Sequence, residues 1–337
     1  MALSTLQILA LKSFAGIGNK TVTKVAKLFS GIPDNAEMPA LITRAGLKKK
    51  GTDGKKTPIT AEDFHEALLA AQEQIKQSNA QGIGILSFWE ERFPNALRDT
   101  MTEDGKKSDP PLLLFYKGDL ALLQMPALAV IGTRDASENA LKAGTFLAKQ
   151  FAEKGFVIVS GLALGCDTAA HEGALAAVNG KTVAVLGNGL DTVYPAKNKT
   201  LAQEILARGG LLLSEYEFGT PATRFTLVAR DRLQASLSDA ALVIQTSVDG
   251  GTMHAARATA AARKPLYAVK YTDEATNALP QTAGNRLLVD EHGAQYLAAD
   301  PDRTVFNRRL NEITAHILET INTASKADTD KKDPTLF

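Results

Sequence analysis

The amino-acid sequence predicts an α/β protein built on a Rossmann-like, doubly wound and mostly parallel β-sheet, with a smaller helical domain before it. The first observation is a series of short, apolar runs without alternation, which are typical of strands buried on both faces. They span residues 128–131, 156–159, 182–186, 211–213 and 241–244. The second is that about a dozen residues with helical spacing separate successive runs, which favours repeated βα units. The third is that glycine-rich loops follow these runs.

The glycine-rich loops predict an anion-binding site. In a doubly wound sheet, such loops gather at the carboxyl ends of the strands, beside helix N-termini whose free N–H groups and dipole favour a phosphate. Glycine suits this position because a side chain would hold the phosphate away from the backbone. The candidate phosphate-binding residues in the loops are Gly132, Thr133, Ser160, Gly161, Gly165, Gly187, Asn188, Gly189, Gly250, Gly251 and Thr252.

The overall composition fits a cytoplasmic globular protein. The 337 residues, 45% of them hydrophobic, can form one large α/β domain and a smaller one. A formal net charge of +1 means that any nucleic-acid binding must come from a local patch. The single cysteine, Cys166, excludes an internal disulfide and fits a reducing compartment. No apolar run reaches membrane-spanning length, and the N-terminus lacks the basic start and cleavage site of a signal peptide.

Residues 1–82 predict the N-terminal helical domain. Its eleven Lys and Arg and seven Asp and Glu residues give 11 − 7 = +4. Apolar residues at helical spacing predict helices over 3–14 and 20–29, joined by Ala15-Gly-Ile-Gly18. This turn is similar to the hairpin of a helix–hairpin–helix or SAM-like module, whose exposed amides hold a nucleic-acid phosphate without reading sequence. The alternative is an αα-hairpin that serves only packing or a protein contact.

The second half of this domain predicts one loop and one long helix. Residues 48–56 are basic, contain glycine and lack an apolar pattern, so they predict a flexible, solvated loop to which we assign no site. Thr60 is expected to cap a helix whose first turn contains Glu62 and Asp63. That helix should run to about Asn79 and end at Gly82.

From residue 83 onward, several sequence blocks occur in a fixed order. They are Trp89-Glu-Glu-Arg-Phe-Pro94, Pro110-Pro-Leu-Leu-Leu-Phe-Tyr-Lys-Gly118, Gly132-Thr-Arg134, Ser160-Gly-Leu-Ala-Leu-Gly-Cys-Asp167 with His171, Gly187-Asn-Gly189 with Tyr194-Pro195, Leu213-Ser-Glu215, and Arg230-x-Arg232. In this order the chain resembles the DprA/Smf family (DNA-processing protein A). The resemblance covers most of the chain up to about Ala299 and implies a Rossmann-like DprA/Smf domain over residues 83–300.

The resemblance also implies a function. Members of such a family bind single-stranded DNA, protect incoming strands and help load the RecA recombinase, as in natural transformation and competence. A homodimer is implied in the same way. The sequence offers no nucleophile and no zinc ligand set, so we expect no catalytic residue, no metal and no cofactor, and a binding protein rather than an enzyme.

Basic residues near the predicted phosphate loops are expected to form a track for a polyanionic strand. Arg134 follows the first loop glycine, where its guanidinium could bind a phosphate with two hydrogen bonds. The other expected contacts are Lys197, Lys199, Arg224, Arg230 and Arg232. The alternative for each arginine is a surface ion pair, for which Arg232 has Asp231 and Asp239 nearby in the sequence.

Asp167 and His171 share one face of a predicted helix because they are four residues apart. They could form an acid–base pair, but we favour a structural role. Asp167 would cap the helix and His171 would bond to a neighbouring loop, so that both shape the pocket. Asp167 should also raise the pKa of the adjacent Cys166 thiol.

Four departures from the family pattern are expected to lie at one side of the cleft. They are Asp231, Gln245, Ser247-Val-Asp-Gly-Gly-Thr252 and Val269-Lys-Tyr271. Two other functions stay open. Gly250-Gly-Thr252 looks a little like the turn of phosphoribohydrolases that cleave nucleoside monophosphates, although residues 253–257 lack the Glu those enzymes use. The cleft could also hold one small nucleotide as a sensor.

The C-terminal part predicts a closing βα segment, a helix and a tail. Residues 285–297 resemble the closing segment, and residues 301–322 should contain an amphipathic helix. Residues 323–337 are expected to be disordered. The final Leu336-Phe337 resembles bacterial docking peptides that bind replication proteins, and the alternative is an accidental end without a partner.

Overall fold

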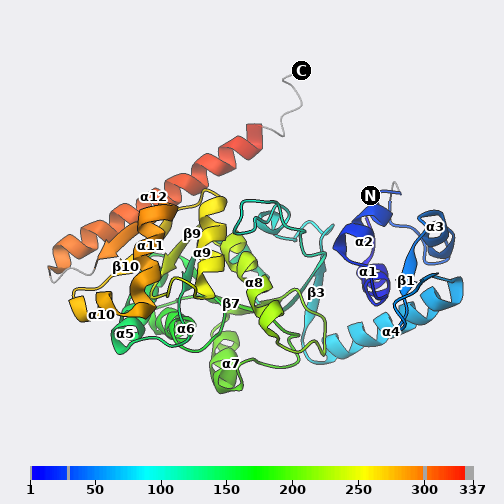
Figure 1. Ribbon diagram of the computed structural model, residues 1–337, viewed down its shortest axis with the longest axis horizontal. Coiled ribbons are helices and arrows are strands. Elements are labelled where there is room, and N and C mark those ends of the chain that lie inside the picture. The colour runs from blue at the N-terminus through cyan, green and yellow to red at the C-terminus, as the bar shows by residue number, and fades with distance from the viewer. Residues whose placement is uncertain (1, 29–30, 299–301, 331–337) are drawn as a thin grey trace.

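The computed structural model describes residues 2–28, 31–298 and 302–330. Figure 1 shows a small N-terminal domain at one end, a larger α/β domain, and a long C-terminal helix along one edge of the larger domain. Within the described ranges, no helix is both long enough and apolar enough to cross a lipid bilayer.

The N-terminal domain contains four helices and a small hairpin. The elements are α1 (Thr5–Lys12), α2 (Asn19–Ala26), α3 (Met38–Arg44), β1 (Lys48–Lys50), β2 (Lys56–Pro58) and α4 (Ala61–Ala80). The predicted cap of α4 is confirmed, because the Thr60 hydroxyl accepts from the Asp63 amide and the Asp63 carboxylate accepts from the Thr60 amide. The predicted flexible loop over 48–56 is wrong: the segment forms the antiparallel β1–β2 hairpin.

The α/β domain contains a nine-stranded sheet. Its order is β11-β10-β9-β5-β6-β7-β8-β4-β3, with all neighbours from β11 to β8 parallel and β4 antiparallel to both β8 and β3. The strands are β3 (Gly84–Ser87), β4 (Leu113–Gly118), β5 (Ala127–Ile131), β6 (Val157–Ser160), β7 (Thr182–Leu186), β8 (Leu211–Ser214), β9 (Ala240–Val243), β10 (Leu266–Lys270) and β11 (Gln295–Ala298). The mostly parallel sheet is confirmed, and β5 to β9 match the five predicted runs within one residue.

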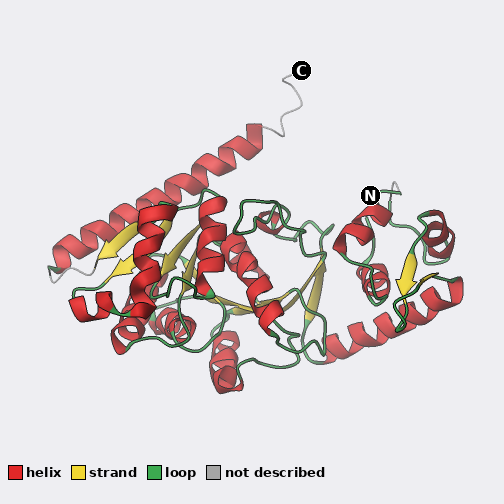
Figure 2. Cartoon of the chain, viewed as in Figure 1, coloured by secondary structure: helices red, strands yellow, loops and turns green. Residues whose placement is uncertain are grey.

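Helices cover both faces of this sheet (Figure 2). They are α5 (Glu138–Glu153), α6 (Cys166–Ala176), α7 (Lys199–Ala207), α8 (Arg224–Leu237), α9 (Thr252–Ala261), α10 (Glu274–Ala278), α11 (Ala283–His292) and α12 (Arg303–Asp330). Alternate residues of each strand enter opposite cores: Leu128 and Val130 pack with α5, α6 and α12, whereas Ala129 and Ile131 pack with α9 and α11. Burial on both faces explains why these strands are apolar without alternation.

The N-terminal domain shares a hydrophobic core with one edge of the sheet. That core contains Leu9 of α1, Phe64 of α4, Phe115 of β4 and Leu201 of α7. Polar contacts add to it, since the Asn19 amide donates to the Pro110 carbonyl (2.9 Å) and Lys12 pairs with Glu217 (3.3 Å). The two domains are therefore held in a fixed arrangement.

The C-terminal helix is longer than predicted. The expected amphipathic helix is confirmed, since Phe306, Leu310, Ile313 and Ile317 are buried in one core with residues of the sheet. Helix α12 then continues to Asp330, eight residues beyond the predicted end at 322. No glycine or proline occurs between 318 and 330 to end it, so the prediction of disorder from residue 323 is wrong for this part. Leu336 and Phe337 lie outside the described residues.

Candidate functional site

A cleft of ≈ 630 Å³ lies at the carboxyl ends of β5 and β9. The chain runs from β5 outward to β6, β7 and β8 on one side and from β9 to β10 and β11 on the other, so the gap between β5 and β9 is the topological switch point. Ligands bind at this position in doubly wound sheets because two loops diverge there and leave space between them. The cleft is lined by the loop after β5, the first half of α8, and the turn that begins α9.

Nine of the predicted site residues line this cleft. They are Gly132, Thr133, Arg134, Asp167, Arg224, Arg230, Gly250, Gly251 and Thr252. Ten others lie outside it: Ser160, Gly161, Gly165, His171, Gly187, Asn188, Gly189, Lys197, Lys199 and Arg232. The structure thus joins the loops after β5 and β9 into one site, whereas the predicted residues Gly187, Asn188 and Gly189 of the loop after β7 do not line it.

The glycines of the β6–α6 loop face protein atoms rather than open space. A Cβ atom on Gly161 would overlap the Arg230 guanidinium. Gly165 has φ +77°, and a Cβ atom there would lie 2.5 Å from the carbonyl oxygens of Thr133 and Arg134. These two glycines are required because neighbouring segments of the chain approach closely. Close packing within the protein therefore accounts for these two glycines, and their role in phosphate binding stays a prediction.

Other predicted phosphate ligands hold the loops together. The Ser160 hydroxyl donates to the Val130 carbonyl (2.7 Å) and thereby ties β6 to β5. The Asn188 side-chain amide donates to the Gly189 and Thr192 carbonyls (2.9 and 3.0 Å). In front of Gly187, the space is occupied by Leu227 of α8. These residues are buried, and the Ser160 hydroxyl and the Asn188 side-chain NH₂ group are already used in contacts within the protein.

Arg134 and Arg224 are the exposed cations of the cleft. Neither side chain makes a hydrogen bond or ion pair within the part of the chain that the structure describes. Arg224 is the first residue of α8, and its position is fixed because the Thr223 hydroxyl accepts from the Thr226 amide in a capping box. Both guanidinium groups are therefore available to an anion at the mouth of the cleft.

Arg230 and Asp167 form the buried floor of the cleft. Arg230 is only 3% exposed, donates from Nη1 to the Val185 carbonyl (2.8 Å) and pairs through Nε with Asp231 (3.3 Å). The Asp167 carboxylate accepts from the amides of Gly161 and Ala163 (3.1 and 3.3 Å). It therefore holds the loop before α6. The prediction that Asp167 caps this helix is wrong, because the N-cap residue is Gly165. Burial raises the pKa of Asp167, although Arg230 and these hydrogen bonds oppose the rise.

Arg232 is bound within the protein, away from the cleft. Its two terminal nitrogens donate to the two carboxylate oxygens of Glu215 (2.6 and 2.7 Å), and its Nε donates to the Ser108 hydroxyl (3.1 Å). The alternative prediction, that Arg232 forms an ion pair, is confirmed, but its partner is Glu215 rather than Asp231 or Asp239. Because helical residues two apart point about 200° from each other, Arg230 and Arg232 do not share one face.

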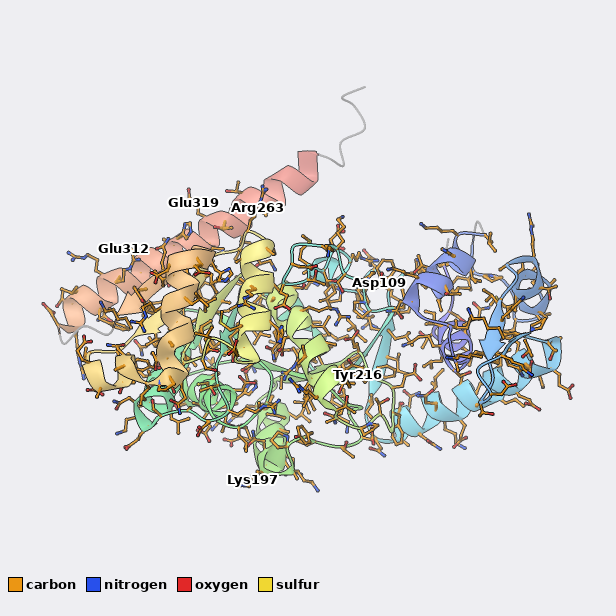
Figure 3. The ribbon with its side chains drawn as sticks, viewed as in Figure 1. Asp109, Lys197, Tyr216, Arg263, Glu312 and Glu319 are labelled. Atoms are coloured by element: carbon orange, nitrogen blue, oxygen red, sulfur yellow. The ribbon has the colours of Figure 1, made fainter. Side chains whose placement is uncertain are left out.

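Lys197 and Lys199 are exposed at the start of α7, and Figure 3 shows Lys197 at the edge of the domain opposite α12. Asn198 between them is buried and donates to the Leu162 carbonyl (2.8 Å). Neither lysine lines the cleft, and Arg232 is bound to Glu215, so only Arg134, Arg224 and Arg230 of the six predicted cations line it.

His171 is buried between α6 and the sheet. Its Nδ1 lies 2.7 Å from the Thr182 hydroxyl, which donates to the Ile158 carbonyl (2.6 Å). The hydroxyl can therefore only accept from His171, so Nδ1 carries the proton. Burial lowers the His171 pKa to about 3, and the ring is neutral. The prediction that His171 bonds to a neighbouring loop is wrong, because its partner, Thr182, is the first residue of β7.

Several lining residues were not predicted as site residues. Asp135, Asp231 and Asp249 bring acidic groups to the cleft, and Tyr194 and His254 also line it. Asp231 is 15% exposed, and burial raises its pKa to about 6, with Arg230 opposing the rise and Asp167 adding to it. The sequence signal for Asp231 was its departure from the family pattern between two arginines.

Two of the four departures do not line the cleft, although the Gln245 carbonyl accepts from the amide of Thr133, which does. The Gln245 side chain accepts from the Ser137 amide (2.9 Å) and donates to the Thr282 hydroxyl (2.8 Å). The Tyr271 hydroxyl donates to the Ile244 carbonyl (2.8 Å). Only Asp231 and the turn over 249–252 line the cleft, so the expectation that all four cluster at one side of it is wrong.

The described residues contain no group of three His, Cys, Asp or Glu side chains placed to hold a metal ion. Burial, followed by the charge of Asp167, raises the pKa of the Cys166 thiol to about 12, which confirms the predicted direction. A thiol in this environment stays protonated and unreactive at neutral pH.

Comparison with known proteins gives a consistent result. The family model for DNA recombination-mediator protein A matches residues 84–306. DNA processing protein DprA of Streptococcus pneumoniae is 44% identical over 145 residues, which are 43% of this chain and 50% of the relative. Protein Smf of Escherichia coli is 36% identical over 162 residues, 48% of this chain and 43% of the relative. The matched region thus spans half or less of these relatives.

Two solved structures are similar to this one. The structure of DprA from S. pneumoniae aligns with a TM-score of 0.67 and 29% identity, covering 88% of this chain and 95% of the other. DNA processing protein A from Helicobacter pylori aligns with a TM-score of 0.55 and 32% identity, covering 68% and 96%. The H. pylori protein is described as having a single-stranded DNA binding mode.

Proposed function

The chain belongs to the DNA recombination-mediator protein A family, and on that premise we propose that it binds single-stranded DNA at the switch-point cleft. Its role would be to protect incoming strands and help load the RecA recombinase, as in natural transformation. It would act by binding, without catalytic turnover, in the cytoplasm. The family match and the similarity to the H. pylori protein support the choice of ligand.

The observation that carries the proposal is the pair of unpartnered arginines, Arg134 and Arg224, beside exposed aromatic rings. Tyr194 lines the cleft and is 44% exposed, and Phe225 directly follows Arg224 and is 84% exposed. A site that combines cations with exposed aromatic rings suits single strands, because cations bind the phosphates and the rings stack on unpaired bases. Neither group reads base edges, so binding should be nearly indifferent to sequence.

The acidic groups of the cleft indicate where the phosphates would lie. A phosphate on the floor would meet Asp231 and Asp167, whose charges repel it. At the mouth it would meet Arg134, Arg224 and the N-terminal turn of α9 at Gly251 and Thr252. We therefore expect the strand to cross the mouth of the cleft.

For several aspects of this proposed role, no contact among the described residues provides direct support. Competence, RecA loading, homodimerisation, the helix–hairpin–helix interpretation of α1 and α2, and docking of Leu336-Phe337 to a replication partner all stay predictions. Each has a direct measurement, such as RecA filament formation on coated DNA or light scattering for the dimer.

A second candidate function is a nucleotide sensor. The cleft volume of ≈ 630 Å³ falls within the range of small-ligand sites, which is about 300–1,000 Å³, so one mononucleotide would fit. The phosphoribohydrolase-like alternative uses the same cleft and would require turnover of a nucleoside monophosphate that Thr252→Ala abolishes.

The test is a binding titration with oligo-dT, a duplex and AMP at two salt concentrations. Our proposal expects the tightest binding to oligo-dT, with affinity that falls steeply as salt rises, because several phosphate contacts release counterions. Binding of AMP with little salt dependence, and none of oligo-dT, would establish the sensor instead. Tight preference for one duplex sequence would contradict both.

A further inference from the structure

We propose that the β1–β2 hairpin forms a second single-stranded-DNA contact, through a lysine face made of Lys48, Lys50 and Lys56. The inference rests on the proposed function, since it concerns the same ligand, and it places part of the binding in the N-terminal domain. The lysines would hold the phosphate chain without reading bases, because each presents a single ammonium charge.

The pairing register brings two of these lysines together. In the antiparallel hairpin, Lys50 lies directly opposite Lys56, and Lys48 lies opposite Pro58. Residues directly opposite share one side of a sheet, and so do residues two apart, so all three lysines point to the same side. All three are exposed, and none pairs with an acidic group within the residues that the structure describes.

On the other side of the hairpin, the lysine is neutralised by an acidic partner. Lys49 points toward α4 and pairs with Asp63 at 2.5 Å. Like charges directly opposite in a sheet are destabilising, whereas opposite charges stabilise. The fold therefore neutralises the inner lysine and keeps the repulsive Lys50–Lys56 pair on the outer side. A polyanion bound there would remove that repulsion.

The hairpin is anchored beside the α1–α2 turn. The Lys50 amide donates to the Ala15 carbonyl (2.9 Å), and a Cβ atom added to the next residue, Gly16, would lie 3.7 Å from the Lys50 Cβ. Lys24 of α2 and Lys27, which caps the C-terminus of that helix, are also exposed. Anchoring fixes the lysine face relative to the rest of the domain.

Charge is distributed unequally between the domains. Residues 1–82 carry a net +4, whereas residues 83–337, with 27 basic and 30 acidic residues, carry 27 − 30 = −3. The excess positive charge of this protein therefore lies in the N-terminal domain, and a long strand held only at the cleft would pass over a surface with net negative charge. Attraction of the strand toward the N-terminal domain follows from this asymmetry.

The fixed arrangement of the two domains makes the second contact depend on strand length. Asn19 and Lys12 hold the N-terminal domain to the α/β domain, so the lysine face and the cleft keep a constant separation. A strand too short to reach both sites gains nothing from the lysines. A longer strand gains their contacts at a high effective concentration.

The experiment uses the full chain and oligo-dT of 6, 12, 24 and 36 nucleotides, with affinity measured from 50 to 200 mM salt. In the triple variant Lys48→Gln, Lys50→Gln, Lys56→Gln, the salt dependence for the longest oligonucleotide should become shallower by about 2 in the log–log slope, since single strands give about 0.7 per phosphate contact. Affinity for the 6-mer should stay unchanged. A control variant, Lys142→Gln, Lys149→Gln, Lys154→Gln, removes three charges from α5 and its C-cap residue and should change neither.

A single substitution separates binding from folding. Lys56→Glu places an acid opposite Lys50 and replaces repulsion with attraction, so the thermal midpoint should stay the same or rise while binding of long strands weakens. An unchanged slope in the triple variant, or an equal change in the α5 control, would overturn the inference. Loss of 6-mer binding in the Arg134→Ala variant would support binding at the cleft and would not bear on the hairpin contact. If that variant binds normally while the lysine variant does not, the proposed function at the cleft fails and the hairpin contact stands.

Discussion

The loops after β5 and β9 and the loops after β6 and β7 have similar glycine-rich sequences but different surroundings. The first pair meets at the switch point, where Gly132 and Gly251 line the cleft. A Cβ atom on Gly251 would meet nothing within 4 Å, although one on Gly132 would overlap Cys166. In the second pair, protein atoms fill the space, with Arg230 against Gly161 and Leu227 against Gly187. The difference teaches that glycine marks a close approach of atoms, and that topology decides whether those atoms belong to a ligand or to the protein.

The largest expected effect is a loss of stability on removal of Arg230, which lies against Gly161 in the loop after β6. Arg230→Ala would leave Asp167 and Asp231 buried without their cation and should lower the free energy of unfolding by about 3–5 kcal/mol. Arg224→Ala, on the same helix but exposed, is the control and should leave stability within about 0.5 kcal/mol. Chemical denaturation measures both. Equal stability of the two variants would show that the buried arginine of the cleft floor is no more important for folding than the exposed arginine at its mouth.

The glycines themselves offer the next comparison. Gly165→Ala combines a strained positive φ with contact against two carbonyls and should cost about 2–4 kcal/mol of unfolding free energy. Gly251 has φ −55°, and a Cβ atom there meets nothing within 4 Å. Gly251→Ala should therefore change stability by less than about 1 kcal/mol. If thermal melts show the same loss of stability in both variants, Gly165 and Gly251 do not differ in how closely protein atoms surround them.

Arg134 tests whether the open pair binds the ligand. Arg134→Ala should weaken oligo-dT binding by about 1–3 kcal/mol, the range for a lost charge-assisted contact, with little change in the thermal midpoint. The control is Arg308→Ala, which removes an exposed arginine of α12. Unaltered affinity in a folded Arg134→Ala variant would show that the loop after β5 is not the DNA site.

The smallest effect concerns pH. Burial raises the pKa of Asp231 to about 6, so the carboxylate is charged at pH 7.5 and largely protonated at pH 5. Because the folded pKa lies above the unfolded value, the stability this group contributes is present below about pH 4 and is lost as pH rises through 6. Protonation also removes a negative charge near the bound strand, so oligo-dT affinity should rise about two- to fivefold from pH 7.5 to pH 5. Asp231→Asn should abolish that part of the pH dependence, and an identical profile in this variant would exclude Asp231 as its source.

The sequence was sufficient for the sheet because burial on both faces leaves an unambiguous apolar pattern. Runs such as 182–186 and 241–244 could be assigned without knowing their neighbours. The hairpin over 48–56 was missed because its strands are lysine-rich and are held by single contacts, Lys50 to Ala15 and Lys49 to Asp63, that are distant in sequence. Helix α12 was predicted too short because polar composition was taken as disorder, although nothing in the sequence ends the helix.

Half of the candidate site could be predicted from the sequence. Arg134 and Gly250-Gly-Thr252 were identified because their loops follow buried strands, and the carboxyl ends of parallel strands share one edge. Arg230 and Arg232 could not be separated in the sequence, since both are arginines of one amphipathic helix. Their different roles depend on Val185 and Glu215, which lie on other elements.

What the sequence alone determined is the set of elements and the chemistry of their ends, because local periodicity, glycine and charge are properties of short segments. What only the tertiary structure decided is which ends face one another. The strand order places β9 beside β5, opens the cleft between their loops and fills the loops after β6 and β7 with side chains of α8. Strand order depends on packing between residues more than a hundred positions apart, such as Leu128 and Ala240, and no short segment contains that information.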